Sequence, residues 1–200
     1  MRAVFLDRDG VINRKPPTGQ YVTKWEDFHI LPGVVEGVSQ LNRGGFAVIV
    51  VTNQRCIAKG LITIADLEKI HQRMRDSLAR AGAIIDGIYC CPHEIEPSCD
   101  CRKPAPGMLL EAARSRGIEL SASWMIGDSN IDVEAGKNAG CRTARLSVRN
   151  DDADESGSRG DASNAADIVA ASLLDAVRQI LQLETAALDS SRAASVREVR

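Results

Sequence analysis

Residues 3–10, with the sequence AVFLDRDG, join four apolar side chains to two aspartates and a glycine. Such a short apolar run bounded by turn-forming residues is typical of a buried strand. A second apolar run covers residues 46–51, and stretches with helical spacing follow the two runs at 32–42 and 64–81. This alternation predicts an α/β fold, a doubly wound and mainly parallel sheet with helices on both faces.

The same alternation continues through the second half of the chain. Strands are expected at 85–89, 124–126, 143–146 and 168–170, and helices at 106–116, 132–138 and 173–183. Thr63 and Asp66 have the spacing of a capping box, which marks the start of the helix expected over 64–81. The fold class therefore follows from patterns along the whole chain.

One region lacks any periodic pattern. Residues 150–167 are rich in Asp, Ser, Ala and Gly, which predicts a flexible surface loop. The last residues, 189–200, have the composition of a frayed tail. We therefore expect a single domain over residues 1–188.

Composition favours a small-molecule partner. The 200 residues are 44% hydrophobic, and 27 acidic against 25 basic side chains leave a formal net charge of −2. No global field attracts nucleic acid or an anionic membrane surface. Five apolar residues precede Asp7, too few for a signal peptide, and no run approaches the roughly 18 residues of a membrane span. We expect a cytoplasmic protein, and a monomer because no uncovered apolar stripe indicates an interface.

The two aspartates of D-x-D-G have the chemistry of a covalent hydrolase. They leave the carboxyl end of an expected central strand, where ligands bind in open α/β sheets. Asp7 can act as a nucleophile that forms an acyl phosphate, and Asp9 can protonate the leaving oxygen and later take a proton from water. Gly10 allows a sharp turn. The alternative is a solvated turn after a strand, since Asp and Gly favour turns in any case.

Two further polar groups favour the hydrolase. Thr52, Asn53 and Gln54 follow the second apolar strand, and hydroxyl, amide and backbone N–H groups at a strand end can hold phosphate oxygens. Arg102 and Lys103 precede an expected helix and can offset the charge of a phosphoryl group beside the aspartates.

A late acidic motif completes the set. Residues 127–132, GDSNID, repeat the order of a strand followed by an acid. Asp128 would complete an oxygen-rich site for Mg²⁺, which prefers carboxylates and water. Asp132 either supports the site or caps the helix that follows it.

The cysteines cluster at spacings that suit a metal. Cys91, His93, Cys99 and Cys101 form C-x-H-x5-C-x-C, the four ligands of a closed tetrahedral zinc site. Such a site has no open position, so the zinc should be structural and should shape a loop over residues 90–103 that delivers the two cations. The alternative is a set of reactive or buried thiols. Cys90, Cys56 and Cys141 are expected to be small buried residues.

Four of these elements resemble, together and in this order, the motifs of the haloacid dehalogenase (HAD) superfamily of phosphotransferases. They are the D-x-D-G motif, the polar residues 52–54, the pair Arg102-Lys103 and the late acidic motif at 127–132. In that family the first aspartate of D-x-D is the nucleophile, the second the acid/base, a threonine binds phosphate, a lysine stabilises charge, and a late aspartate binds magnesium. The resemblance assigns these roles to Asp7, Asp9, Thr52, Lys103 and Asp128. It also implies that Asp9 is a metal ligand through its backbone carbonyl.

The zinc-bearing loop narrows the resemblance to the histidinol-phosphatase-like branch, and other segments, such as 31–34 and 50–54, are more similar to its heptose bisphosphate phosphatases. This implies removal of the C7 phosphate from a heptose 1,7-bisphosphate, with histidinol phosphate as the alternative substrate. The expected substrate contacts are Arg8, Gly19, Gln20, Tyr21, Thr52, Asn53, Gln54, Arg55, Arg102 and Lys103.

The chain departs from that branch in two places. Arg55-Cys56 replaces the usual Ser-Gly, so a bulky cation either contacts substrate or faces solvent at a loop tip. The loop 15–20 contains two prolines and is longer than usual, so the accepted sugar or the substrate class can differ. The spacing of the motifs leaves little room for a separate cap domain, which predicts an open site. A zinc-stabilised binding module without turnover is the alternative outside enzymes.

Overall fold

A single six-stranded sheet organises the molecule. The computed structural model describes residues 1–147 and 165–198, with side chains as far as residue 187. In chain order the elements are β1 (Ala3–Leu6), a 3₁₀ turn (Trp25–Asp27), α1 (Val34–Arg43), β2 (Ala47–Asn53), α2 (Ile64–Arg80), β3 (Gly87–Cys91), α3 (Gly107–Arg116), a 3₁₀ turn (Leu120–Ala122), β4 (Trp124–Gly127), α4 (Asn130–Ala139), β5 (Arg142–Leu146), β6 (Ile168–Ala170) and α5 (Leu173–Glu198).

All paired strands run parallel, in the order β3-β2-β1-β4-β5-β6. The strand order reverses at β1, because the chain adds strands on one side of it and then on the other. The predicted α/β class with a doubly wound parallel sheet is therefore confirmed, and ligands bind at such a reversal in open sheets.

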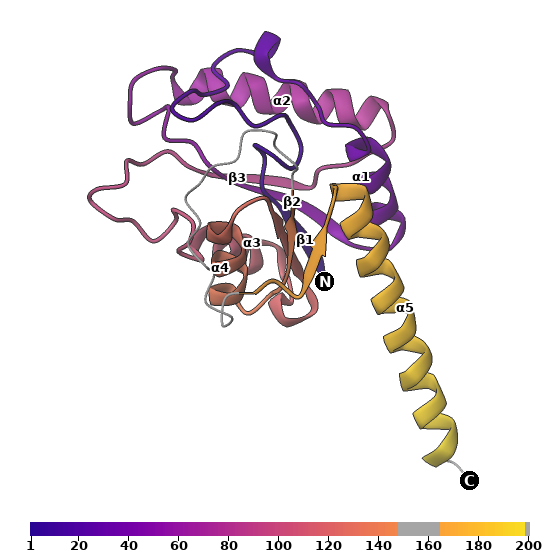
Figure 1. Ribbon diagram of the computed structural model, residues 1–200. Helices are drawn as coiled ribbons and strands as arrows, with labels where there is room; N and C mark the ends of the chain where they lie inside the picture. Colours follow the sequence, from indigo (N-terminus) through magenta and orange to yellow (C-terminus); the bar gives the residue numbers. More distant parts are fainter. Residues whose placement is uncertain (148–164, 199–200) are drawn as a thin grey trace.

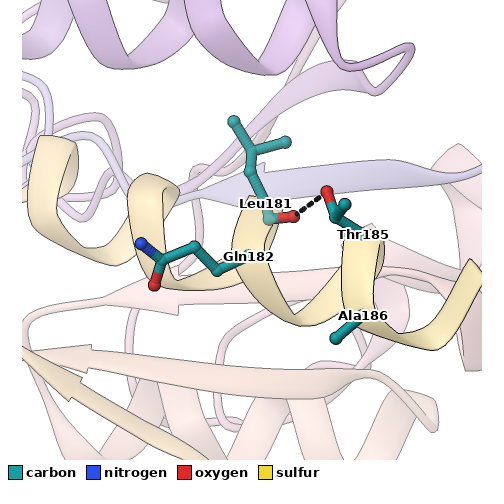
Figure 2. Close-up of a pocket in the computed structure, with 4 residues that line it drawn as sticks. All are labelled: Leu181, Gln182, Thr185 and Ala186. Carbon is teal, nitrogen blue, oxygen red and sulfur yellow. Dashed lines mark hydrogen bonds between the residues drawn. The ribbon is translucent and has the colours of Figure 1, made fainter. Parts of the chain in front are cut away.

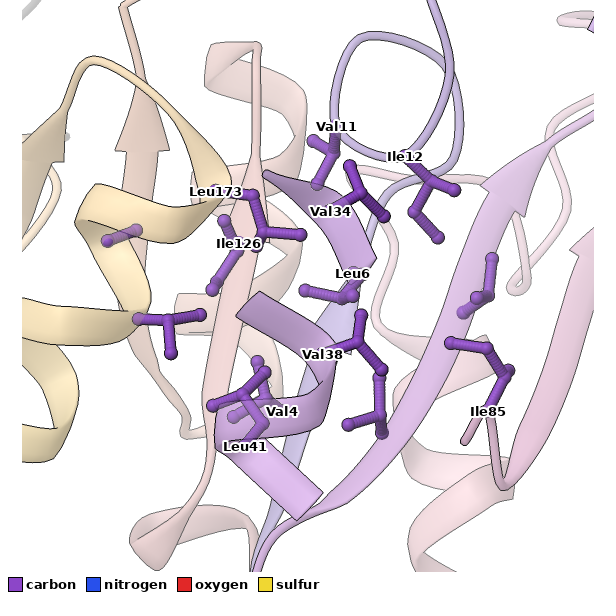
Figure 3. Close-up of a cluster of buried hydrophobic side chains, with 14 of the residues drawn as sticks. Val4, Leu6, Val11, Ile12, Val34, Val38, Leu41, Ile85, Ile126 and Leu173 are labelled. Carbon is purple, nitrogen blue, oxygen red and sulfur yellow. The ribbon is translucent and has the colours of Figure 1, made fainter. Parts of the chain in front are cut away.

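Helices cover both faces of the sheet (Figure 1). Successive strand residues point to opposite faces, so Val4 and Leu6 pack with α1, α2 and α5, whereas Phe5 packs with α3 and α4. Figure 3 shows the first of these cores, in which Val38 of α1 and Leu173 of α5 meet the side chains of the central strands. Burial on both faces explains why the strands read as continuous apolar runs.

Two strands near the site differ from the expected bounds. β2 continues through Asn53, and β3 starts two residues later than predicted and ends at Cys91. Parallel pairing of Thr52 with Cys90 and of Asn53 with Cys91 extends both strands, and the backbone of Asp86 pairs with Val48 before the strand begins. The cysteine loop therefore starts directly beside the end of β2.

The helix boundaries agree closely with the pattern at α2 and α3. Thr63 caps α2 through the predicted capping box with Asp66. α5 differs, because it continues to Glu198 where the sequence pattern predicts an end at residue 183 and fraying from 189. Residues 184–198 contain no glycine or proline, so nothing in the chain stops the helix. Most of the predicted loop 150–167, namely residues 150–164, lies outside the described residues.

α5 has two parts with different surroundings (Figure 1). Its first turns bury Leu173, Val177 and Ile180 against the sheet, whereas its later turns project away from the body. A shallow hollow of about 450 Å³ where α5 leaves the body is lined by Leu181, Gln182, Thr185 and Ala186 (Figure 2). No helix among the described ranges has the length and apolarity needed to cross a membrane.

Candidate active site

The ends of three neighbouring strands bring the predicted motifs together. Asp7 follows β1, Thr52 lies near the end of β2, and Asp128 follows β4. Because β1 lies between β2 and β4, Asp7 occupies the middle of this edge, and its backbone N–H donates to Ile126 O at 3.0 Å. Loops, with no separate cap domain in the described part, border the site.

Asp7 is held on two sides. Lys103 Nζ lies 2.8 Å from Asp7 Oδ1, and the backbone N–H of Arg8 donates to the same oxygen at 2.7 Å. Burial raises the pKa of Asp7 to about 7. The nearby charge of Asp132 also opposes ionisation, and the positive charge of Lys103 offsets only part of these two effects. The carboxylate is therefore directed by its donors toward one orientation at the strand end.

Lys103 lies at the centre of the charged cluster. Its side chain is 2% exposed, and Nζ lies 2.8 Å from Asp7 Oδ1 and 2.6 Å from Asp132 Oδ1 while donating to Val51 O at 2.9 Å. Burial opposes its charge, but the carboxylates of Asp132 and Asp7 outweigh burial and raise its pKa. Lys103 therefore remains a cation within reach of the nucleophile.

Asp132 performs both of the roles that the sequence left open. Its Oδ2 accepts from Ser129 N at 3.2 Å and from Ser129 Oγ at 2.5 Å, which forms a capping box at the start of α4. Its Oδ1 pairs with Lys103, so one carboxylate fixes the helix and the lysine together. Gly127 leaves room for this carboxylate, since a Cβ there would lie 2.1 Å from Asp132 Cβ.

Asp9 is surrounded by donors. Arg8 Nη2 donates to both carboxylate oxygens, at 3.0 and 2.9 Å, Asn13 Nδ2 donates at 2.9 Å, and Gln54 Nε2 donates at 3.1 Å. Burial would raise the pKa of Asp9, but the charge of Arg8 and the hydrogen bonds from Asn13 and Gln54 outweigh it and lower the pKa. The carboxylate is therefore ionised and held in one orientation.

Three expected substrate contacts have other partners. The Arg8 side chain is 0% exposed and pairs with Asp9, so the expected contact of Arg8 with substrate remains a prediction. The amide of Asn53 exchanges two hydrogen bonds with the backbone of Lys103, both at 3.1 Å, and so fixes the lysine loop. Gln54 donates to Asp9 and to Thr52 Oγ1, the latter at 2.8 Å.

A cluster of acids suits a magnesium ion. Carboxylate oxygens of Asp7, Asp128 and Asp132 all lie within 4.8 Å of one another. The metal ligands expected from the sequence are Asp7, Asp9 and Asp128, whereas for Asp132 the sequence allows either a supporting role at the site or a helix cap. Lys15 was also not anticipated as a contact: its Nζ lies 2.7 Å from Asp128 Oδ2.

Gly10 is required where the chain passes this cluster. A Cβ at residue 10 would lie 2.2 Å from Asp128 Oδ2, and φ is +94°. Only glycine combines that conformation with the close approach. The turn after Asp9 therefore depends on Gly10 for both reasons.

The four predicted zinc ligands converge. Cys99 Sγ lies 3.5 Å from Cys91 Sγ and from Cys101 Sγ, and His93 Nδ1 lies 3.2 Å from Cys101 Sγ and 3.6 Å from Cys91 Sγ. A tetrahedral zinc ion with bonds of about 2.3 Å to sulfur separates its ligands by similar distances. The residues present therefore fit a closed structural zinc site, and Cys90 lies outside it.

The expected cations on this loop have mixed positions. Arg102 Nη1 donates to His93 O at 3.3 Å, so it lies against the cysteine cluster. Arg55 forms an ion pair with Glu94 on the same loop. Arg55 therefore has a partner within the protein itself, Glu94, whereas the sequence predicts that it contacts either substrate or solvent.

The loop before residue 22 supplies the remaining candidates. Gly19 and Gln20 are exposed, and Gln20 N donates to Pro17 O at 2.9 Å in a turn. Tyr21 packs against Lys59, whose Nζ lies 5.2 Å from the ring centroid. No described contact joins these three residues to the aspartates, so their expected role in substrate binding remains a prediction.

Comparisons with known proteins agree with this geometry. The HAD-hydrolase-like family model matches residues 100–176. The D-glycero-beta-D-manno-heptose-1,7-bisphosphate 7-phosphatase of Photorhabdus laumondii is 44% identical in an alignment 140 residues long that covers 66% of this chain and 73% of the relative. The Escherichia coli K12 enzyme of the same name is 42% identical in an alignment 151 residues long that covers 72% of this chain and 78% of the relative.

A solved structure is similar over nearly the whole length. The crystal structure of the D,D-heptose 1,7-bisphosphate phosphatase from B. bronchiseptica, complexed with magnesium and phosphate, superposes with a TM-score of 0.78. It is 32% identical and covers 91% of this chain and 99% of its own.

The reversal of strand order and the acids at the strand ends define a phosphatase of the HAD type. The chain belongs to the HAD superfamily and, within it, to the family of D-glycero-beta-D-manno-heptose-1,7-bisphosphate 7-phosphatases.

Proposed function

We propose that this chain hydrolyses the C7 phosphate of D-glycero-β-D-manno-heptose 1,7-bisphosphate. The observation that carries the proposal is the arrangement around Asp7. This nucleophile pairs with Lys103 at 2.8 Å and lies next to Asp9, which accepts hydrogen bonds from Arg8. The relatives named above, at 44% and 42% identity, supply the substrate and the β-anomer.

The residues support a two-step reaction. A carboxylate oxygen of Asp7 attacks phosphorus, the bond between phosphorus and the C7 oxygen breaks, and Asp9 gives a proton to the leaving oxygen. Water then attacks the phosphoryl group on Asp7 while Asp9 takes a proton from that water, the bond between the Asp7 oxygen and phosphorus breaks, and inorganic phosphate leaves with the Asp7 carboxylate restored. Asp9 is ionised before substrate binds, so the negative phosphate must first raise its pKa before it can act as the acid.

Two metals fit the donor sets. Mg²⁺ would be held by Asp7, Asp128 and the backbone carbonyl of Asp9, with Asp132 close by, and when bound it neutralises charge on the phosphoryl group. Zn²⁺ would be held by Cys91, His93, Cys99 and Cys101 and would shape the loop before Lys103.

We propose Thr52 and Lys103 as phosphate-binding groups, because both lie at the strand ends beside Asp7. Arg102 and the loop of Gly19, Gln20 and Tyr21 are the proposed contacts with the sugar. With no partner chain required by this arrangement, we propose that the protein acts as a monomer, which light scattering of the purified protein tests.

The test is phosphate release with magnesium, comparing the β- and α-anomers of heptose 1,7-bisphosphate with histidinol phosphate. The expected result is a preference for the β-anomer of at least tenfold in kcat/KM. A preference for histidinol phosphate, or equal turnover of all three, overturns the substrate assignment. Asp7→Asn should abolish turnover with the fold retained, and substantial residual activity contradicts the covalent mechanism.

A further inference from the structure

His71 is a buried polar residue that the proposed reaction does not use. It lies on α2, in the middle of a helix face whose other buried members, including Leu67, Met74 and Leu78, are apolar. The side chain is 7% exposed, and it also lines a surface cleft of about 640 Å³ between α2 and β3 with Gln72 and Cys90. An imidazole is costly to bury unless a hydrogen bond compensates, so its partner indicates its role.

That partner is Arg8. His71 Nε2 lies 3.2 Å from Arg8 Nη1, and the guanidinium has only N–H donors. Nε2 must therefore accept this hydrogen bond, which places the ring proton on Nδ1 and makes the imidazole neutral. Burial, together with the charge of Arg8, lowers the pKa of His71 to about 3, in agreement with a neutral ring.

Arg8 in turn holds Asp9. Its Nε and Nη2 donate to Asp9, with Nη2 in contact with both oxygens at 3.0 and 2.9 Å, while Nη1 is occupied by His71. The guanidinium is planar and rigid, so fixing Nη1 fixes the direction of the two groups that face Asp9. One aromatic ring also lies against the guanidinium: the centroid of the Phe28 ring is 5.8 Å from the Arg8 guanidinium carbon.

We infer that His71 is a positioning residue for the acid/base carboxylate: it orients Arg8, and Arg8 orients Asp9. The chain of contacts runs from α2 through the interior to the end of β1. Since proton transfer requires a donor within about 3 Å and well aligned, a small rotation of Asp9 lowers the rate of the chemical step more than it weakens substrate binding. This inference rests on the proposed role of Asp9.

The test compares His71→Leu with His71→Gln. Leucine removes the acceptor, whereas the amide oxygen of glutamine lies about where Nε2 lies and can accept from Arg8. We expect His71→Leu to lower kcat on the heptose bisphosphate about tenfold with KM within about twofold, and His71→Gln to recover most of the loss. Met74→Leu, a change on the same buried face at a side chain that cannot accept the hydrogen bond of Arg8 as His71 does, is the control and should retain wild-type kcat.

A second substrate separates positioning from general loosening. p-Nitrophenyl phosphate has a good leaving group that needs no proton, whereas the sugar phosphate leaves as an alkoxide. We expect His71→Leu to lose less than about threefold in the first step on the aryl ester, measured as the burst of p-nitrophenol, because the second step uses Asp9 with either substrate. Equal losses in the first step on both substrates, measured in single turnovers, or no gain from glutamine over leucine, overturn the inference and leave His71 a packing residue. Wild-type kcat on the sugar in His71→Leu also overturns it.

Two controls keep the result interpretable. If His71→Leu unfolds below the assay temperature, His71→Asn takes its place, because its shorter amide stays polar and does not reach Arg8. The wild-type protein must turn over both substrates, and its failure on the sugar alone refutes the substrate proposal without bearing on His71, since any primary alkyl phosphate that it hydrolyses then serves in the same comparison.

Discussion

Lys103 is the residue on which the charge balance of the site depends. It is the cation between the buried carboxylate of Asp132 and the largely buried carboxylate of Asp7, and its own backbone is held by Asn53. Removing one member of a buried ion pair leaves uncompensated charge, which is more destabilising than the pair is stabilising. The lysine therefore contributes to folding as well as to the proposed chemistry.

Lys103→Met should lower the free energy of unfolding by about 3 kcal/mol in the absence of magnesium and abolish turnover. Arg102→Met is the matched control, since that cation contacts only a backbone carbonyl among the described contacts and should change stability little. Urea denaturation of both variants measures the difference. Equal stability of Lys103→Met and wild type contradicts this role of the lysine.

His71 also predicts how stability depends on pH. Its pKa is lowered to about 3 in the folded protein, against about 6.5 when unfolded, so the unfolded state binds the proton first as pH falls. The stabilisation is present above pH 6.5 and is lost as pH falls toward 3. Between pH 7.5 and 5.5 the wild type should lose about 1.4 kcal/mol that His71→Gln does not lose.

Denaturant titrations of the two proteins at both pH values measure this difference. Other groups, such as Asp7, titrate in both proteins and cancel in the comparison. Parallel pH profiles for wild type and His71→Gln would show that the histidine is not buried in its neutral form.

At the scale of elements, the loop from β3 to α3 links the two metal sites. It starts beside the end of β2 because β3 pairs with that strand as far as Cys91, and it carries Arg102 and Lys103 immediately after its last cysteine. The four ligands must hold this loop compact, since its segment 92–99 contains no regular secondary structure. A zinc ion there would fix the loop and so position Lys103 without contacting it.

Cys99→Ser should therefore release the zinc and lower kcat at least tenfold. Cys90→Ser is the matched control: Cys90 lies on β3 beside the expected ligand Cys91 but outside the cluster, and this variant should keep one zinc per chain and most of the activity. Elemental analysis and phosphate release on the same preparations test both statements. Full activity in a zinc-free Cys99→Ser protein contradicts the positioning role.

At the scale of the whole molecule, α5 closes the sheet with its first turns only. Leu173, Val177 and Ile180 are buried, and Glu184 then ties the helix to the sheet through Arg2, at 2.7 Å, and through Arg142. Beyond this point the helix projects from the body (Figure 1). The molecule therefore needs the start of α5 but not its end.

A chain that ends at Ala187 should unfold within about 3 °C of the full-length protein and keep its kcat. A chain that ends at Ser172 should not fold, because it exposes three buried aliphatic side chains at roughly 1.5–3 kcal/mol each. Thermal unfolding followed by circular dichroism distinguishes these outcomes. A large loss of stability in the chain that ends at Ala187 would show that the projecting turns contribute to the fold.

The sequence by itself determined the strands, their parallel arrangement and the four motifs at their ends. These signals are local: an apolar run such as 3–6, a D-x-D-G turn, or four ligands within eleven residues report their own period and spacing. Local signals of this kind also indicated most helix boundaries, where capping residues such as Thr63 interact within one turn.

Only the tertiary structure decided which partners the polar side chains have. The burial of Arg8, the pairing of Lys15 with Asp128 and the contact of Arg8 with His71 join residues that are far apart along the chain or on different elements. The same is true of Asp132, whose helix cap could be inferred locally but whose pairing with Lys103 could not. Such contacts depend on how elements pack in three dimensions, a property that no short stretch of sequence contains.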